Sequence, residues 1–253
     1  QKRQVVCIAS VLIHKNNKEL YALAQYLPLD ACVAIQGETG KDIIFANNLY
    51  LPGITAQEKK NKPCSLICLG DIHYGHKLFQ KEKFNECIQW MNTKQPDAVI
   101  ITGDLVEGIG VYPGQEKELA ITDLDQQYQQ IAQLLSRIKV PIYLIPGNHD
   151  GKRLAEPQPA LDHPSLQQSH IHCIPSPTSI TIKGYSILLY HGMSLTYYAD
   201  TIEPLRKEGG VNNPAALMEY VLELRHLGPT YGSTPVLPVD PDPLLIATIP
   251  DVF

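Results

Sequence analysis

From residue 64 onward, short apolar runs alternate with longer stretches in which apolar residues recur every three or four positions. The runs 65–69, 98–102 and 142–145 have the length of buried strands. Between them, the apolar residues of segments 84–91 and 124–138 recur at helical spacing. Strands that alternate with helices in this way predict an α/β fold, with a largely parallel sheet and helices on its faces.

The C-terminal third continues with a less regular pattern. Residues 179–182 and 185–190 flank Lys183-Gly184 and predict a hairpin. Residues 215–227 predict a further helix. Residues 244–249 follow a proline-rich stretch and predict one more strand.

The first 55 residues have a different pattern, in which β-rich runs are short and turn residues separate them. Runs 5–13, 32–35 and 43–45 predict strands, and residues 20–26 can form a strand that returns from a turn. This region therefore predicts a small all-β module. The polar stretch 57–62 predicts a linker, which divides the chain into 1–55, 56–63 and 64–253.

Composition narrows the class of protein. The chain has 253 residues, 44% hydrophobic and 19% charged, which suits one large folded domain and a smaller one. Its net charge of −5 argues against a freestanding nucleic-acid binder. A phosphodiester substrate remains compatible with this charge, because bound divalent metals supply local positive charge. The six cysteines are scattered and predict small buried hydrophobes in a reducing compartment.

The chain has the features of a cytoplasmic protein without a membrane segment. No apolar run approaches the roughly 20 residues needed to span a bilayer. The sequence begins at Gln1 and has no signal pattern of basic and then apolar residues, which we interpret as a fragment of a cytosolic protein.

Polar clusters with metal-binding side chains follow four of the predicted strands. Because sites in open α/β sheets form beyond the carboxyl ends of the strands, we expect these clusters to converge. They contain two aspartates, one asparagine and three histidines: Asp71, His73, Asp104, Asn148, His149 and His191.

Carboxylate, imidazole and carboxamide ligands suit Mn, Fe or Zn. A carboxylate that bridges two such metals, about 3.5–4 Å apart, would allow them to activate a water and clamp a phosphoryl group. Asp104 is the candidate bridge, because it follows the central strand of the three. Each cluster alone is typical of an ordinary turn, and only the four together indicate a two-metal phosphoesterase.

The order Asp-x-His, Gly-Asp, Gly-Asn-His-Asp and His-Gly resembles the calcineurin-like metallophosphoesterase superfamily, from about residue 64 to the C-terminus. Longer segments resemble the small subunits of archaeal family-D DNA polymerases: GDIHYG (70–75), GDLVEGIGVYPGQ (103–115), AEPQPAL (155–161), YHGMS (190–194) and RHL (225–227). The resemblance implies a phosphoesterase β-sandwich flanked by helices. It also implies that residues 1–55 are part of an oligonucleotide-binding (OB) β-barrel.

The same resemblance implies roles for individual residues. Asp71 and His73 would bind the first metal, Asp104 would bridge, and Asn148 and His191 would bind the second. His149 would act as a catalytic residue near the scissile phosphate, oriented by Asp150. The implied activity is 3′→5′ exonuclease on single-stranded or mismatched DNA ends, with two divalent ions such as Mn²⁺. The implied partner is the large catalytic subunit of the polymerase.

One departure from the family pattern leaves alternatives open. The family completes its site with a Gly-His-x-His segment, which would lie beyond Phe253. A non-catalytic assembly subunit, like the eukaryotic polymerase B-subunits, is therefore one alternative. A phosphomonoesterase or protein phosphatase on the same fold is another, since a fold does not fix a substrate.

Overall fold

The computed structural model describes residues 10–14, 16–55, 62–150 and 153–253, and the chain divides into two compact units. The first unit comprises Gln1–Ala56, Ser194–Thr234 and Leu244–Ile249. The second comprises Gln57–Met193, Pro235–Pro243 and Pro250–Phe253. Segment Ser194–Thr234, which the sequence assigned to the C-terminal domain, thus groups with the N-terminal residues. Residues 57–61 of the expected linker lie outside the described residues.

A parallel sheet forms the centre of the second unit. Its four strands lie in the order β4-β5-β6-β7 and are all parallel: β4 (Leu66–Leu69), β5 (Ala98–Ile101), β6 (Ile142–Leu144) and β7 (Ile171–Cys173). Helix α2 (Lys81–Lys94) connects β4 to β5, and α3 (Leu124–Leu135) connects β5 to β6. The predicted alternation of strands and helices is therefore confirmed. Strand β7 was not predicted, because the polar His172 interrupts its apolar residues and leaves no apolar run.

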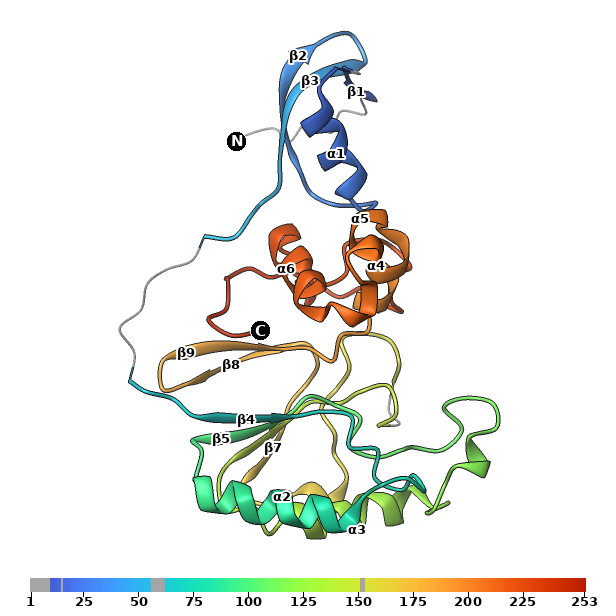
Figure 1. Ribbon diagram of the computed structural model, residues 1–253, viewed down its shortest axis with the longest axis vertical. Coiled ribbons are helices and arrows are strands. Elements are labelled where there is room, and N and C mark those ends of the chain that lie inside the picture. Colours follow the sequence, from blue (N-terminus) through green and yellow to red (C-terminus); the bar gives the residue numbers. More distant parts are fainter. Residues whose placement is uncertain (1–9, 15, 56–61, 151–152) are drawn as a thin grey trace. The chain divides into compact units, whose positions relative to one another are not determined.

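Both faces of this sheet are covered, as the alternation along β5 illustrates. Val99 and Ile101 face the core that α2 and α3 close, together with Ile131 and Leu135. Ala98 and Ile100 face the opposite way, onto the antiparallel hairpin of β8 (Thr178–Ile182) and β9 (Tyr185–Leu189). Figure 1 shows the helices on one side of the sheet and the hairpin on the other.

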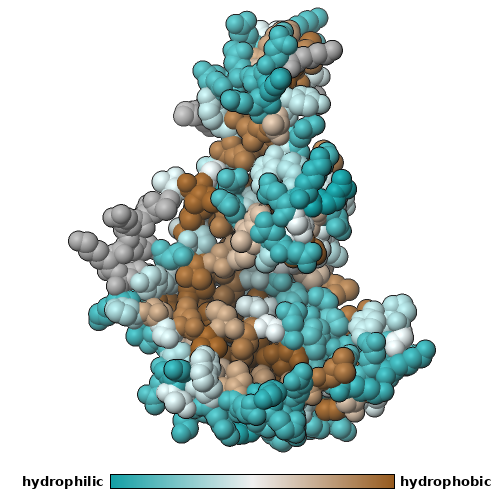
Figure 2. All heavy atoms as spheres, in the orientation of Figure 1, coloured by the Kyte–Doolittle hydropathy of each residue, from teal (hydrophilic) through white to brown (hydrophobic). Residues whose placement is uncertain are grey.

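The outer surface of the second unit is mainly polar where the two helices lie, along the lower edge of Figure 2. The loops of this unit contain two short 3₁₀ helices, Gln115–Lys117 and Pro164–Leu166. Among the described helices, none combines the length and apolar character needed to cross a membrane. The five cysteines that the structure describes are all free.

The first unit contains a smaller sheet of three strands in the order β1-β3-β2. Strand β1 (Ser10–Ile13) runs parallel to β3 (Ile43–Tyr50), and β2 (Ala34–Thr39) runs antiparallel to it. Helix α1 (Lys18–Tyr26) covers one face. The remaining helices of the unit are α4 (Leu195–Thr201), α5 (Glu203–Lys207), the 3₁₀ turn Gly210–Asn212 and α6 (Pro214–Leu224). The partial OB-fold expected for residues 1–55 stays a prediction.

Two predicted strands are absent from the described structure. Residues 20–26 form helix α1 instead, because Asn17 caps its first turn by accepting from the Leu20 amide, and Leu20, Leu23 and Leu27 then share one buried face. Residues 244–249 form only an isolated bridge between Leu245 and His226. The carbonyls of Ile246 and Ala247 accept from the Arg225 guanidinium, which binds this segment to the end of α6 rather than to a sheet.

Candidate metal centre

The loops that follow β4 and β5 place the first three predicted ligands. Asp71, His73 and Asp104 all have left-handed backbones, with φ of 52°, 47° and 50°. Such conformations cost about 1–3 kcal/mol each and persist only where surrounding contacts hold them. Here the two loops bond to each other, since the His73 amide donates to the Asp104 carbonyl at 2.9 Å and the Asp71 amide to the Gly103 carbonyl at 3.2 Å.

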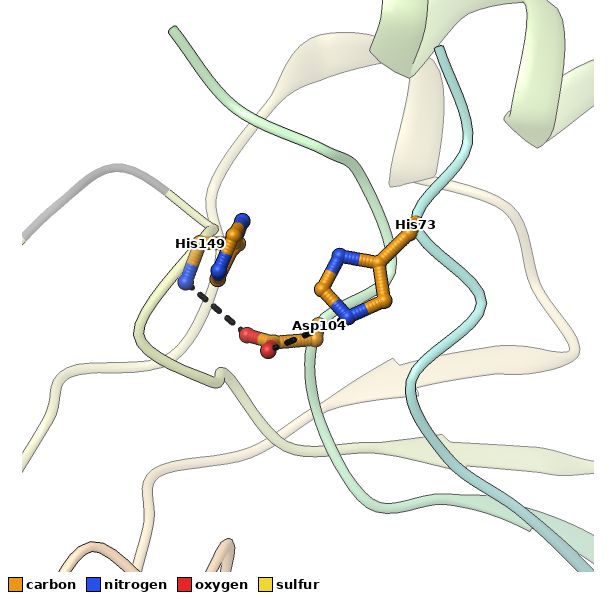
Figure 3. Close-up of side chains that lie close together, drawn as sticks. All are labelled: His73, Asp104 and His149. Carbon is orange, nitrogen blue, oxygen red and sulfur yellow. Dashed lines mark hydrogen bonds and ion pairs between the residues drawn. The ribbon is translucent and has the colours of Figure 1, made fainter. Parts of the chain in front are cut away.

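Asp104 lies at the centre of the cluster and is 3% exposed. Its Oδ2 lies 3.6 Å from His73 Nε2, and its Oδ1 lies 3.7 Å from His191 Nε2. The two oxygens of one carboxylate therefore face different imidazoles. Oδ1 also accepts from the His149 amide at 2.8 Å, which fixes the loop after β6 to the loop after β5 (Figure 3).

The remaining predicted ligands lie beside the two imidazoles that face Asp104. Asp71 Oδ1 is 3.9 Å from His73 Nε2, and Asn148 Oδ1 is 2.9 Å from His191 Nε2. His73, Asp104 and His149 bring one ligand atom each within 4.8 Å of one another, and Figure 3 shows the two imidazoles beside the carboxylate. This nitrogen and oxygen donor set fits a divalent ion such as Mn, Fe or Zn.

Backbone carbonyls set the orientation of two of the imidazoles. His149 Nδ1 lies 2.7 Å from the Glu107 carbonyl oxygen, and His191 Nδ1 lies 2.9 Å from the Thr102 carbonyl oxygen. A carbonyl only accepts, so each Nδ1 must donate. In a neutral imidazole the proton on Nδ1 leaves the Nε2 lone pair free for a metal, which is the arrangement that ligating histidines require.

The sequence profile described as Calcineurin-like phosphoesterase matches residues 65–239. The chain belongs to this family. The match begins at the strand that leads to Asp71 and His73, and it covers all the metal-binding candidates.

Relatives within the calcineurin-like phosphoesterases are more specific. The chain is 32% identical over 262 aligned residues to the DNA polymerase II small subunit of Methanothermobacter thermautotrophicus, and the match covers 96% of this chain and 54% of that protein. It is 36% identical to the protein of the same name from Halobacterium salinarum, with 96% and 50% covered. For the protein of that name from Pyrococcus abyssi, identity is 32%, with 97% and 42% covered. The chain spans about half the length of these relatives, so it is homologous to DNA polymerase II small subunits over that part.

Glu107 is a residue of this phosphoesterase site that the sequence reasoning missed. It is 2% exposed, and its Oε2 lies 2.9 Å from His73 Nδ1 while its carbonyl holds His149. Oε1 accepts from Gln115 Nε2 at 2.9 Å. One buried glutamate therefore positions two imidazoles. Its place three residues after Asp104, in the same strand-end cluster, was the only signal available.

Asp150 has a different neighbourhood from the one that the sequence suggested. Its Oδ1 accepts from the Val106 amide at 3.1 Å, and its Oδ2 accepts from the Gly147 amide at 2.8 Å. Burial raises the pKa of the Asp150 carboxyl to about 7, although these two amides act to lower it. The carboxyl thus joins the loops after β5 and β6, while Glu107 contacts the imidazole of His149.

Gly147 allows the closest approach in the phosphoesterase site. A Cβ built on this residue would lie 2.2 Å from Asp104 Oδ1 and 2.7 Å from His191 Cε1. No side chain fits there, so the predicted Gly-Asn-His-Asp segment requires glycine at its first position for space rather than for conformation.

Proposed function

We propose that the chain is part of the small, proofreading subunit of a replicative DNA polymerase, where it hydrolyses DNA from the 3′ end. The observation that carries the proposal is the Asp104 carboxylate, whose two oxygens face different imidazoles, those of His73 and His191, within a calcineurin-like phosphoesterase domain. Homology to DNA polymerase II small subunits supports DNA as the substrate and a large polymerase subunit as the partner. A subunit of such a polymerase would work in the cytoplasm.

Two divalent ions, with Mn²⁺ as the first candidate, complete the proposed site. Asp71, His73 and Asp104 would hold the first, and Asp104, Asn148 and His191 the second. The Asp104 oxygens lie 3.6 Å from His73 Nε2 and 3.7 Å from His191 Nε2, which fits this assignment. Such a pair supplies an activated water and charge stabilisation for in-line attack on phosphorus.

The protein's own residues then orient the reaction. His149 stands beside His73 with ring centroids 4.6 Å apart, and the Glu107 carbonyl keeps the proton on Nδ1. We assign two roles to His149. It stabilises the charge that develops on the phosphoryl group, and it donates the proton that the leaving 3′ oxygen needs, since a protonated imidazole donates from Nε2. Asp150 contributes by holding the amides of Val106 and Gly147, and so the loop that carries His149.

The direct test follows shortening of a 5′-labelled single strand with Mn²⁺, using the protein that contains this chain. We expect a ladder of products from the 3′ end, which Asp104→Ala abolishes. The matched control is Asp125→Ala, because that carboxylate is 79% exposed and lies outside the centre. The nuclease proposal fails if the wild type is inert or if Asp104→Ala degrades DNA equally well. An inert protein that still binds the large subunit would favour the assembly role.

A further inference from the structure

A cavity of about 400 Å³ opens beside the metal centre and is lined by two chemically different sets of residues. One set comprises Asp71, His73 and His149 of the proposed reaction site. The other set is apolar and aromatic and comprises Leu78, Phe79 and Tyr112. Volumes of roughly 300–1,000 Å³ are typical of pockets that receive small organic ligands. The apolar set has no role in holding metals, so it needs an explanation of its own.

The apolar set stands on two loops that are fixed to each other. The Lys77 amide donates to the Glu118 carbonyl at 2.8 Å, and His76 forms an antiparallel bridge with Leu119. The ring of Phe79, which lines the cavity, contacts Tyr74 and Phe84, with ring centroids 4.8 and 5.6 Å apart. The cavity is therefore preformed, and a ligand would not have to order its walls.

Tyr112 presents its ring close to His149. The ring centroid lies 6.0 Å from that of His149. Its hydroxyl donates to Glu118 Oε2 at 2.5 Å and lies 3.2 Å from Glu107 Oε1, so the polar end has partners, and the residue is 37% exposed. Leu78, which also lines the cavity, is 79% exposed. Apolar groups left in water at the edge of a polar site are suited to cover an aromatic ligand.

We propose that this cavity receives the terminal nucleoside of a DNA strand, with its base against Tyr112 and the side chains of Leu78 and Phe79. This inference rests on the proposed nuclease function and adds the substrate class of the subsite. Stacking on an aromatic ring accepts any of the four bases, because every base has a π-face. A base that is still paired brings its partner strand with it, whereas an unpaired end enters alone. The subsite would thus select frayed or mismatched ends.

The test measures binding as well as cleavage. Two probes are used, thymidine 5′-monophosphate and 2-deoxyribose 5-phosphate, which lacks the base. Their dissociation constants are compared in the wild type, Tyr112→Phe and Tyr112→Leu. Both variants lose the hydroxyl contacts to Glu107 and Glu118, but only the second loses the ring. We expect the wild type and Tyr112→Phe to prefer the nucleotide by about tenfold, and Tyr112→Leu to lose that preference.

Trp90→Ala is the control, because Trp90 is 51% exposed on α2 and does not line the cavity. Thermal unfolding of each variant checks that the fold is intact. Equal preference for the nucleotide in Tyr112→Leu and in the wild type overturns the subsite. If the preference depends on the ring but DNA is not cleaved, the nuclease function fails and the subsite stands. If DNA is cleaved but no variant changes the preference, the subsite alone fails.

Discussion

The two sheets of this chain differ in how completely they are buried. In the phosphoesterase sheet, β4 to β7, all four residues of β5 are buried, since helices cover one face and a hairpin the other. In the N-terminal sheet, β1 to β3, the buried core has three members among the residues that the structure describes: Leu20, Ala46 and Leu49. Phe45 and Tyr50 of β3 are each 50% exposed.

This difference explains why the metal-binding residues lie in loops of the phosphoesterase sheet. Three left-handed residues and a close-packed carboxylate follow the ends of β4 and β5, and each carries a conformational or desolvation cost. A sheet that is covered on both faces holds such loops in one geometry. The N-terminal sheet has one covered face, and its outer face instead offers side chains to solvent.

The largest expected effect tests how tightly the loops of the phosphoesterase sheet are packed. Gly147→Ala would place a Cβ 2.2 Å from Asp104 Oδ1, so it must displace the carboxylate or the loop. We expect Mn²⁺ affinity, measured by calorimetric titration, to fall by more than the about 100-fold that loss of an outer ligand partner costs. Gly40→Ala, in the turn between β2 and β3 of the N-terminal sheet, is the control, since its Cβ would meet nothing closer than 3.5 Å. Equal metal affinity in both variants would break the comparison.

A core substitution in each sheet compares their stabilities directly. Leu144→Ala empties a site in β6 that is fully buried, and we expect it to cost about 3 kcal/mol of unfolding free energy. Leu49→Ala in β3 removes a side chain from a small core that can collapse more easily, and we expect about 2 kcal/mol or less. Hydrogen exchange on peptides of each unit reports the two losses separately. A larger loss for Leu49→Ala would reverse the ranking of the two sheets.

The third prediction concerns side-chain support inside the phosphoesterase site. In Glu107→Gln an amide group replaces the carboxylate that faces His73 Nδ1. The NH2 of the amide can then face the N–H of the imidazole, and two donors do not form a hydrogen bond. We expect a 10- to 100-fold loss of metal affinity or cleavage rate, roughly the cost of removing an outer partner of a ligating histidine. Glu203→Gln is the matched control, because that side chain is 56% exposed and pairs with Lys207 in the first unit. Equal losses in both would assign the effect to charge alone.

The same contrast explains what the sequence could predict. The first three strands of the parallel sheet, and the polar clusters after them, could be predicted because β4, β5 and β6 are continuous apolar runs, whereas β7 carries the polar His172. Residues 20–26 were wrongly predicted as a strand. Over seven residues, a helix with one buried face and a half-buried strand have similar apolar content. The grouping of α6 with the N-terminal residues depends on contacts such as Tyr220 Oη to the Tyr26 carbonyl, 194 positions apart. No local pattern contains such a contact.

The smallest expected effect is a shift in one exposed carboxyl. The Tyr112 hydroxyl holds the pKa of Glu118 below its usual 4.5, and Lys207 does the same for Glu203 in the first unit. A lowered pKa gives stability that is present above pH 4.5 and is lost as the pH falls through the folded-state value. In Tyr112→Phe we therefore expect the pKa of Glu118 to rise, by NMR titration, and the stability difference from the wild type to shrink in acid. The pKa of Glu203 should not move. An unchanged Glu118 pKa would mean that the Tyr112 hydroxyl does not hold this carboxylate.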